Sequence, residues 1–554
     1  MAAVAPAPGP SANVRPFAAG PQLVAAALPA ARAGRAKLRI GVFADQAAQP
    51  RWLVEALARV ASSDFAEVVY LAIDGARREP FAEPFPWRAY RALDRRLFGR
   101  GADPSARTDI AALVAPDRRI RPGHAVHVDV AFAVGNVDDE AIARLARYGA
   151  WRYCFGDGRG LHEPLAAVRE VLEAAPVTGT AIRIRRSEEA VDRIACASWS
   201  RTVAFSFART RDTMLAKSAD FLSRSLRALH GEGAAWIEHA TDLAPPAERG
   251  RFPRGAALAG GLAQLASRVV QRAVERELTV DQWQVAWRFT DVEPWSGSLE
   301  GFHRLVPPKD RFWADPFPIQ VNGRHYIFFE ELPFGAGKAH ISVVEVDRSG
   351  RASEPTPALV RDYHLSYPFL VQEAGALYMI PETAHNRAVE AYRCVEFPHK
   401  WKLAKVLLRD VWCADATFHR ANDRWWMFAS FGADGGEVND ELHLFHADRL
   451  LGEWKPHRAN PVKSDVRGAR PAGALFRHGD ALFRPGQICT PIYGAGIALH
   501  RVSRLDECGY VEEEVRRILP ATRDAVLGMH TINRAGALSA TDLFVRRPRF
   551  GSRD

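Results

Sequence analysis

The sequence predicts an α/β domain with a mainly parallel sheet, followed by an all-β five-bladed β-propeller. Three observations support this. The chain has 554 residues, more than a single hydrophobic core usually supports. Early in the chain, β-branched runs alternate with helical spacing, as in parallel sheets. From Trp283 onward, five segments open alike at intervals of roughly 50 residues, the size of a four-stranded propeller blade.

These patterns divide the chain into five parts. An Ala/Pro-rich start has too few large apolar residues to fold, so we expect a disordered tail there rather than a signal peptide. The expected parts are a tail at 1–35, an α/β domain at 36–204, a helical linker at 205–280, the propeller at 281–548 and a basic tail at 549–554.

The composition narrows the class of partner. The net charge of +9 favours an acidic partner such as a phosphate or an acidic glycan. The arginines are dispersed and no nucleic-acid-binding motif is present, so we expect no nucleic acid partner. Six scattered cysteines without a CxxC pair predict neither a disulfide framework nor a metal site, and they fit a cytoplasmic location. We expect no cofactor, because phosphate-cradling and dinucleotide fingerprints are missing.

The α/β domain begins with a strand, a helix and a second strand. Leu38–Phe43 is a β-run, Pro50–Val60 has helical spacing with Pro at its start, and Glu67–Ile73 is another β-run. This order predicts a parallel pair joined by a right-handed crossover. Residues 76–123 are weakly patterned, and we expect loop and short helix there. Further elements are expected at Val128–Val134 (strand), Asp138–Arg147 (helix), Trp151–Phe155 (strand) and Ala181–Ile184 (strand).

Three motifs in this domain resemble folate-dependent formyltransferases. They are Val130-Ala-Phe-Ala-Val-Gly135, Tyr148-Gly-Ala-Trp-Arg-Tyr-Cys-Phe-Gly-Asp157 and Val177-Thr-Gly-Thr-Ala-Ile182. The family places a catalytic Asn and His in the second motif and an Asp beyond the third. This chain has Arg152 and Cys154 at the first two positions, and Ala190 near the third, with Glu189 and Asp192 close by. Formyl transfer needs a base and an oxyanion donor at those points, so the resemblance implies a non-catalytic domain.

The linker contains two segments with helical spacing. Thr213–Leu229 is one. The second, within 256–278, has an apolar stripe with arginines toward its other side. We expect this stripe to dock against the domains, and the alternative is an amphipathic helix on an anionic membrane surface. The stripe consists of Leu258, Leu262, Leu265, Val269 and Ala273.

Polar residues recur at the openings of the five propeller repeats. The first strand of a propeller blade lines the central channel, so we expect these side chains to converge. They are Asp315, Tyr367 (or Ser366), Asp415, Arg470 and His530. The second strands add Glu330, Glu382, Arg484 and Gln487 just beyond them. Trp283–Phe289 lacks partners of its own, and we expect it to close the ring by completing the last blade.

Converging carboxylates suit chemistry at a glycosidic bond, because one can protonate the leaving oxygen while another stabilises positive charge. The propeller resembles the glycoside hydrolase clan of arabinanases, β-xylosidases and fructosidases. That resemblance implies that Asp315 is the base or nucleophile and that Asp415 stabilises the transition state. The acid of the clan is a Glu in a later blade, where this chain has Arg470. Glu382 is the substitute acid that remains.

A more specific resemblance covers residues 281–548. The motifs include Phe312-Trp-Ala-Asp-Pro-Phe317, Tyr378-Met-Ile-Pro-Glu-Thr383 and Ala414-Asp-Ala-Thr-Phe418. They look like the N-terminal domain of plant glucosamine inositolphosphorylceramide transferases, whose bacterial relatives carry a formyltransferase-like domain in front. In the plant proteins, sugar transfer is attributed to a separate domain. The resemblance therefore implies a link to glycans and does not assign the activity.

We thus expect a carbohydrate-active protein that binds a glycan, with phosphorylated or acidic sugars included, at the propeller channel. The expected catalytic set is Asp315, Asp415 and Glu382. The expected binding set is Glu330, Tyr367, Arg470, Arg484, Gln487 and His530. Arg470 and Arg484 can either pair with the carboxylates or hold a phosphate or uronate. The alternatives are a non-catalytic sugar-binding scaffold and a divergent sugar formyltransferase. The oligomeric state stays open.

Overall fold

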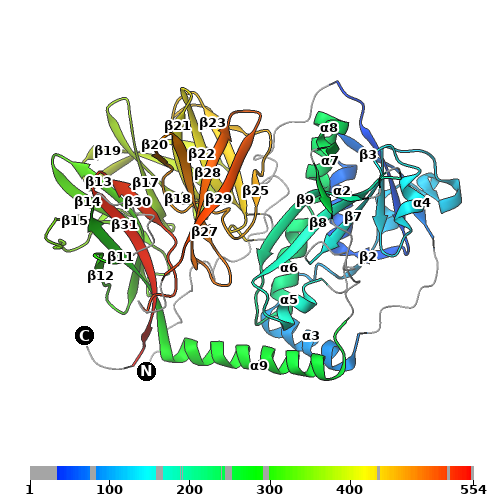
Figure 1. Cartoon of the computed structure of the whole chain (residues 1–554), viewed down its shortest axis with the longest axis horizontal. Helices are drawn as coiled ribbons and strands as arrows, with labels where there is room; N and C mark the ends of the chain where they lie inside the picture. The colour runs from blue at the N-terminus through cyan, green and yellow to red at the C-terminus, as the bar shows by residue number, and fades with distance from the viewer. Residues whose placement is uncertain are drawn as a thin grey trace. The chain divides into compact units, whose positions relative to one another are not determined.

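The computed structural model divides into two compact units, Ala30–Val270 (the N-terminal unit) and Gln271–Asp554 (the propeller unit), and Figure 1 labels their elements. The structure describes residues 34–74, 83–156, 166–187, 189, 191–238, 240–243, 252–290, 299–432, 437–520 and 525–550. The expected tail before residue 34, Ala190 and the whole segment 244–251 lie outside these residues. No described helix is both long enough and apolar enough to cross a bilayer.

The N-terminal unit contains an eight-stranded sheet with the order β10-β9-β8-β7-β6-β1-β3-β5. Strands β5, β3, β1, β6 and β7 run parallel, as the βαβ pattern predicted, whereas β8, β9 and β10 are antiparallel. The strands are β1 Leu38–Ala44, β3 Ala66–Ile73, β5 Arg119–Ile120, β6 Val130–Val134, β7 Ala150–Phe155, β8 Val177–Arg185, β9 Asp192–Arg201 and β10 Thr241–Leu243. Strands β2 Ala48–Pro50 and β4 Arg107–Asp109 pair separately.

The helices of this unit cover the sheet with their apolar faces. In α2, the residues Trp52, Leu53, Leu57 and Val60 are buried at helical spacing and join the core formed by β1, β6 and β7. All five residues of β6 are buried, which identifies it as a central strand. The helices are α2 Arg51–Ala61, α3 Phe85–Phe98, α4 Asp139–Ala143, α5 Val168–Leu172, α6 Phe207–Ser218, α7 Phe221–Glu232, α8 Ala234–Glu238 and α9 Gly255–Leu278.

Several elements differ from the sequence-based expectation, among them the helix expected at Asp138–Arg147, which is the five-residue α4, Asp139–Ala143. The segment around 76–123 contains α3, a regular helix of 14 residues. The antiparallel strand β9 was not predicted. The single helix expected at Thr213–Leu229 is two helices, α6 and α7. At their junction the Tyr153 hydroxyl donates to the Ser218 carbonyl and accepts a hydrogen bond from the Leu222 amide. A side chain from β7 therefore satisfies the backbone groups that the break leaves open.

The apolar stripe of α9 packs on the N-terminal unit. Leu258 and Leu265 are buried, and Leu262 and Val269 are partly buried, in a cluster with Trp87 of α3. Gly261 permits this close approach, because a Cβ there would lie 3.0 Å from the Leu172 side chain. The stripe from Leu258 to Val269 therefore packs against protein, as expected, and does not face lipid.

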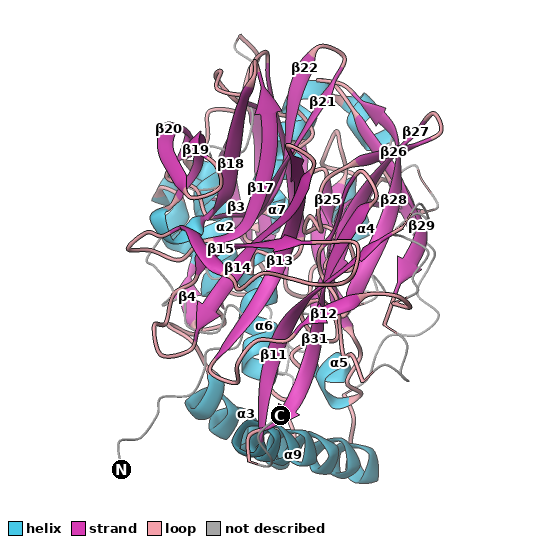
Figure 2. Ribbon diagram, turned by 90° about the vertical axis from the view of Figure 1, so that its left-hand side faces the viewer, coloured by secondary structure: helices cyan, strands magenta, loops and turns pink. Residues whose placement is uncertain are grey.

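The propeller unit consists of five sheets, each built on four ordered strands (Figure 2), so the predicted five-bladed propeller is confirmed. Blade 1 has β13 Arg311–Val321, β14 Arg324–Pro333, β15 His340–Val346 and β16 Thr356–Leu359. Blade 2 has β17 Ser366–Glu373, β18 Ala376–Thr383, β19 Ala388–Glu396 and β20 Lys400–Arg409. Blade 3 has β21 Cys413–Ala421, β22 Arg424–Phe431, β23 Glu441–Ala447 and β24 Lys455–Pro456, with β25 Lys463–Ser464 beside β23. Blade 4 has β26 Phe476–His478, β27 Ala481–Ile488, β28 Gly496–Leu505 and β29 Tyr510–Ile518.

Blade 5 closes the ring with strands from both ends of the unit. It has the order β12-β11-β31-β30, with β11 Thr279–Phe289, β12 His303–Leu305, β30 Ile532–Ala535 and β31 Leu538–Pro548. β11 pairs with β31 along its whole length, from Thr279 opposite Pro548 to Phe289 opposite Leu538. The predicted closure by Trp283–Phe289 is confirmed, and it leaves no blade incomplete.

Candidate functional site

The recurrent opening motif forms the same β-bulge in the first three blades. The bulged residues are Asp315, Tyr367 and Asp415, with positive φ angles of 53°, 45° and 53°. In each blade the strand pairing skips two residues, between Ala314 and Phe317, between Ser366 and Phe369, and between Ala414 and Thr417. A left-handed non-glycine residue is strained, and bulges redirect side chains, so the motif aims these three side chains away from the regular pleat.

Asp315 lies in a buried cluster with residues of blade 5. Its Oδ1 lies 3.0 Å from His530 Nε2 and accepts a hydrogen bond of 2.7 Å from the Thr531 hydroxyl. Its Oδ2 accepts from the Tyr367 amide at 3.2 Å. His530 Nδ1 lies 3.1 Å from Oδ1 of a second carboxylate, Asp542. Asp542 also accepts from the Asp315 amide, at 3.1 Å, so the two ends of the ring meet at this cluster.

The electrostatics of this cluster hold His530 as an imidazolium. Burial alone would lower its pKa, but Asp542 and Asp315 outweigh that effect and raise the pKa to about 10. The imidazolium and the Thr531 hydroxyl in turn keep the pKa of Asp315 below its ordinary value despite burial. Asp315 is therefore ionised at neutral pH. Asp315, His530 and Asp542 also each place a ligand atom within 4.8 Å of the others, so a cation could replace the proton here.

A second cluster joins blades 2, 3 and 4 around Arg470. Its guanidinium donates to Asp415 twice, at 2.6 and 3.2 Å, and to the Asn439 amide oxygen at 3.0 Å. The Gln487 side chain donates to Asp415 at 2.7 Å. Glu382 Oε2 lies 3.5 Å from Arg470 Nη2. Arg470 thus pairs with a carboxylate, which is one of its two expected roles, and its donors are not free for a phosphate.

Glu382 and Asp415 are neighbouring carboxyls that differ in their hydrogen bonds and in their exposure. Burial raises the pKa of both carboxyls. The pKa of Glu382 is raised well above its ordinary value, because the neighbouring Asp415 charge adds to burial. Arg470 and Gln487 donate hydrogen bonds to Asp415, and the Arg470 charge opposes the rise in its pKa, whereas Glu382 Oε2 makes no hydrogen bond to the described residues. The Glu382 side chain is 15% exposed against 1% for Asp415, so Glu382 is the protonated and more accessible member.

Tyr367 connects the two clusters. Its hydroxyl lies 2.8 Å from the Thr417 hydroxyl and accepts a hydrogen bond of 2.7 Å from the Gly473 amide. Together with its amide bond to Asp315, it links the inner strands of four blades. Glu330 lies at the edge of the site, with its Oε1 3.1 Å from His364 Nε2, and burial raises its pKa.

One expected site residue lies elsewhere. Arg484 is fully buried inside blade 4, where it donates twice to Glu512 at 2.7 Å and once to the Gly468 carbonyl at 2.7 Å. Within the described part of the chain, Arg484 forms no hydrogen bond or ion pair with Asp315, Asp415 or Glu382. Because β27 alternates, Gln487 reaches Asp415 while Arg484, three residues earlier, points to Glu512 on β29, the last strand of its own blade.

Several residues of the two clusters were not predicted from the sequence. Asp542 and Thr531 hold His530 and Asp315, Asn439 holds Arg470, and the Tyr493 ring lies 5.1 Å from the Arg470 guanidinium and 5.2 Å from the His530 ring. The signal for Asp542 is the set of polar residues in Ser539-Ala-Thr-Asp542, directly before the apolar Leu543-Phe-Val545 of β31. Asn439 and Tyr493 lie in loops, where no periodicity marks them.

Comparison with known proteins matches a segment that contains most of the site to a known family. Residues 305–533 match the family described as "Glucosamine inositolphosphorylceramide transferase 1, N-terminal". Glucosamine inositolphosphorylceramide transferase 1 from Oryza sativa subsp. japonica is 35% identical over 208 residues, which is 37% of this chain and 28% of that protein. Its counterpart from Arabidopsis thaliana is 33% identical over 215 residues, 38% of this chain and 28% of that protein.

The chain therefore spans well under two thirds of these plant relatives. Two solved structures are also similar. Zg3597, a family 117 glycoside hydrolase from Zobellia galactanivorans, has a TM-score of 0.31 and 12% identity, covering 48% of this chain and 90% of that chain. An exo-1,5-alpha-L-arabinanase from a bovine ruminal metagenomic library has a TM-score of 0.30 and 17% identity, covering 43% and 92%. These scores are too low to support a conclusion about activity.

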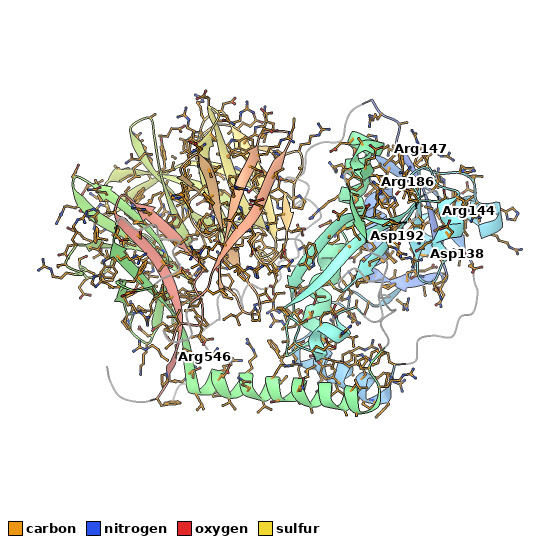
Figure 3. The ribbon with its side chains drawn as sticks, viewed as in Figure 1. Asp138, Arg144, Arg147, Arg186, Asp192 and Arg546 are labelled. Atoms are coloured by element: carbon orange, nitrogen blue, oxygen red, sulfur yellow. The ribbon has the colours of Figure 1, made fainter. Side chains whose placement is uncertain are left out.

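The positions of the formyltransferase resemblance lie in an ion-pair network of the N-terminal unit. Arg152 donates through Nε to both Asp139 oxygens, at 3.0 and 2.9 Å, and through Nη2 to the Val137 carbonyl. Arg183 pairs with Asp139 and lies 3.1 Å from Asp192, which is labelled in Figure 3. Burial raises the pKa of the Cys154 thiol beside this network. Arg152 and Asp192 are thus engaged in structural pairing, and Cys154 is a buried thiol of low reactivity.

Proposed function

We propose that the propeller unit binds a carbohydrate at the two joined clusters and acts on a glycosidic bond, by hydrolysis or by transfer. In this proposal Glu382 is the proton donor to the leaving oxygen. Asp315 is the permanent anion that stabilises positive charge on the sugar, and Asp415 holds Arg470 and raises the pKa of Glu382. The substrate class is a glycan or glycolipid. The names of the plant relatives and the match over 305–533 support that class.

One observation carries the proposal. Within one interior site, a carboxyl whose pKa is raised well above its ordinary value stands with a carboxyl whose pKa is lowered. Chemistry at a glycosidic bond requires this division of protonation states. Packing alone would not favour a second buried carboxyl here, because each buried carboxyl costs stability unless it is fully paired. Glu382 Oε2 makes no hydrogen bond to the described residues.

A ligand screen tests the proposal. Thermal unfolding of the full chain would be followed with neutral sugars, sugar phosphates, uronates and nucleotide sugars, for the wild type, Asp315→Asn and Glu382→Gln. We expect at least one sugar to raise the melting temperature of the wild type. The wild type should form product from that sugar, and Glu382→Gln should not. Stabilisation equal to about 2.7 kcal/mol is expected at a ligand concentration of 100 times Kd. If no sugar shifts any of the three proteins, the proposal fails.

A second candidate is a non-catalytic sugar-binding module. The position of the clan's blade-4 acid carries Arg470, which neutralises Asp415. This favours binding without turnover. The same screen separates the two functions, since a binding module would show stabilisation by a sugar with no product from any variant.

We also infer that the N-terminal unit does not transfer formyl groups. At the two described positions, Arg152 is held in salt bridges and the Cys154 thiol has a raised pKa, so neither residue serves as a base. A formyl-folate should therefore leave the melting temperature unchanged. Stabilisation by the formyl-folate, or formylation of an amino sugar, would contradict this inference.

A further inference from the structure

Helix α3 presents an apolar face to solvent. Phe85 is 73% exposed, Leu93 is 56% exposed and Leu97 is 61% exposed. Positions 85, 89, 93 and 97 recur every four residues and therefore share one side of the helix, where residue 89 is an exposed alanine. The opposite side is fixed by Trp87 and Asp94, which are buried. The orientation of α3 is thus set by its packing, and the exposed apolar face is not the result of a loose helix.

The charges on this face are positive. Arg88 and Arg96 are exposed beside the apolar residues, and the Arg88 guanidinium lies 5.9 Å from the Phe85 ring centre. The only acidic residue of α3 is Asp94, and it is buried and accepts a hydrogen bond from the Ala208 amide at 2.6 Å. An apolar stripe flanked by arginines and lacking exposed carboxylates is typical of helices that lie in a membrane interface.

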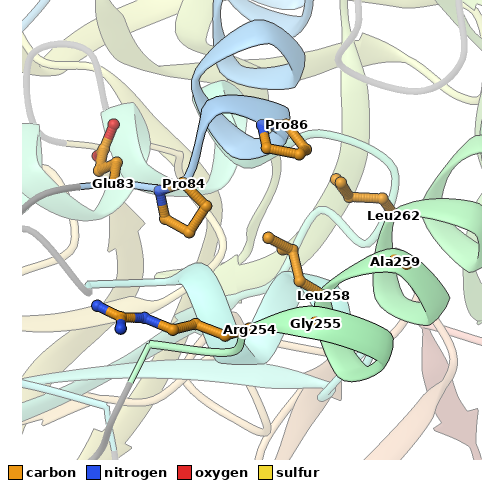
Figure 4. A pocket seen from close by; sticks show the side chains of 8 residues that line it. All are labelled: Glu83, Pro84, Pro86, Arg254, Gly255, Leu258, Ala259 and Leu262. Carbon is orange, nitrogen blue, oxygen red and sulfur yellow. The ribbon is translucent and has the colours of Figure 1, made fainter.

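An apolar hollow continues this face toward α9. It has a volume of about 520 Å³ and lies where α3 and α9 begin (Figure 4). Its lining comprises Glu83, Pro84, Pro86, Arg254, Gly255, Leu258, Ala259 and Leu262. Both ribbon views draw α3 beside α9 (Figures 1 and 2). From Gly255 to Val270, α9 has no acidic residue, and Ala259, Ala263, Ala266 and Val270 are exposed along one side.

The exposed apolar residues are concentrated at this place. Within the described part of the N-terminal unit, the exposed large apolar side chains are Phe85, Leu93, Leu97, Val126, Val191 and Val270. Three of the six belong to α3 and one to α9. Scattered apolar residues are normal on a protein surface, but a contiguous apolar patch marks a site of interaction.

We propose that this face of α3, together with the adjoining hollow and the exposed side of α9, docks on the anionic surface of a lipid bilayer. The apolar side chains would enter the interface while Arg88 and Arg96 contact lipid phosphates. A second copy of this chain fits less well, because a symmetric contact would bring the same arginines together. The lipid-facing residues belong to α3 and to the exposed side of α9, whereas Leu258 and Leu265 of the leucine stripe are buried against protein. The proposal does not depend on the proposed function.

Vesicle co-sedimentation of the full chain tests this proposal. The vesicles would contain phosphatidylcholine alone or phosphatidylcholine mixed with phosphatidylglycerol. We expect binding to the anionic vesicles only. Phe85→Ser with Leu93→Ser should weaken binding by about tenfold or more, because two large apolar side chains no longer enter the interface. Arg88→Gln with Arg96→Gln should weaken binding to the anionic vesicles by about tenfold as well.

The matched control is Val126→Ser with Val191→Ser, which removes two exposed apolar side chains elsewhere on the same unit. This control should bind like the wild type, and unchanged melting temperatures would show that all variants fold. Absence of binding to anionic vesicles would overturn the proposal. Equal binding by Phe85→Ser with Leu93→Ser would do the same, because attraction by charge alone would then explain the result. Self-association that this double variant abolishes would instead identify a second copy as the occupant.

Discussion

His530 illustrates how single residues in the propeller depend on partners distant in sequence. It belongs to the last predicted blade opening, and only the fold brings it between Asp315 and Asp542. A histidine in an apolar site would be neutral. Here two buried carboxylates reverse that tendency and make the imidazolium the stable form.

This arrangement predicts that the folded protein loses stability as the pH rises into the alkaline range. The pKa of His530 is about 10 in the folded protein against an ordinary value of 6.5, so between these values the folded state holds a proton that the unfolded state has lost. Its contribution is complete below pH 6.5 and is lost as the pH rises toward 10. The free energy of unfolding should fall by up to about 1.4 kcal/mol per pH unit in this window.

Urea unfolding at several pH values would measure this slope for the wild type and for His530→Gln, which should flatten it. His500→Gln is the control, because the pKa of His500 is lowered to about 3 and it is neutral in both states throughout this window. An unchanged slope in His530→Gln would refute the assignment of the proton.

Substitution by Gln should change the free energy of unfolding in opposite directions at Glu382 and at Glu331. The raised pKa of Glu382 means that its ionisation costs stability as the pH rises above the ordinary value of 4.5. Glu382→Gln should therefore be more stable than the wild type at pH 8, and the difference should shrink toward pH 5. The pKa of Glu331 is lowered to about 2 by His340, Ser342 and Arg311. Glu331→Gln should lose stability at pH 8, since its charge-assisted bonds stabilise the ionised form.

Thermal unfolding of both variants at pH 5 and pH 8 would check these signs. A loss of stability in Glu382→Gln at pH 8 would show that Glu382 is an ordinary paired carboxylate. It would also remove the proton donor from the proposed mechanism.

At the scale of elements, the repeated bulge is the structural unit of the site. The sequence showed that Ala-Asp recurs at Asp315 and Asp415, but the equivalent residue of blade 2 is Tyr367. Its hydroxyl accepts from the buried Gly473 amide of blade 4 and bonds Thr417 of blade 3. The bulge of blade 2 therefore stabilises the site by packing and hydrogen bonding, whereas those of blades 1 and 3 supply carboxylates.

Tyr367→Phe should destabilise the propeller unit by about 1–3 kcal/mol, because it leaves the buried Gly473 amide without its acceptor. Tyr378→Phe is the matched control on the neighbouring strand β18, as the Tyr378 hydroxyl makes no hydrogen bond within the described residues. Chemical unfolding would measure both. Equal effects of the two substitutions would show that the Tyr367 hydroxyl contributes nothing beyond volume.

At the scale of the whole molecule, the propeller unit depends on its closure. Strand β11 contributes to a blade whose other inner strands come from the end of the unit. In β11, the buried residues Trp283, Val285 and Trp287 pack into the cores of blades 5 and 1. Without β11 the edge of β31 would be unpaired, and these core residues would be lost.

A fragment of residues 271–554 should fold cooperatively, whereas a fragment of residues 300–554, which lacks β11, should not. Near-ultraviolet circular dichroism and the cooperativity of thermal unfolding would compare the two. A cooperative transition in the shorter fragment would mean that closure by β11 is dispensable.

The sequence alone determined the number of blades, their opening residues and the closing strand, because blade length and strand alternation are local patterns with fixed periods. It also placed β1, α2, β3 and β6 close to their true bounds. It did not find β9 or the junction of α6 and α7. Tyr153, on a distant strand, satisfies the backbone at that junction.

Only the tertiary structure decided which polar residues meet. In the fold, Arg470 pairs with Asp415, and Asp542, Thr531 and Tyr493 lie in the site. Arg484 instead pairs with Glu512 inside its own blade. Side-chain direction near a bulge depends on register and on a positive φ, which residue identity alone does not specify. The protonation states of Glu382 and His530 also follow from the tertiary structure, since burial and neighbouring charge set them.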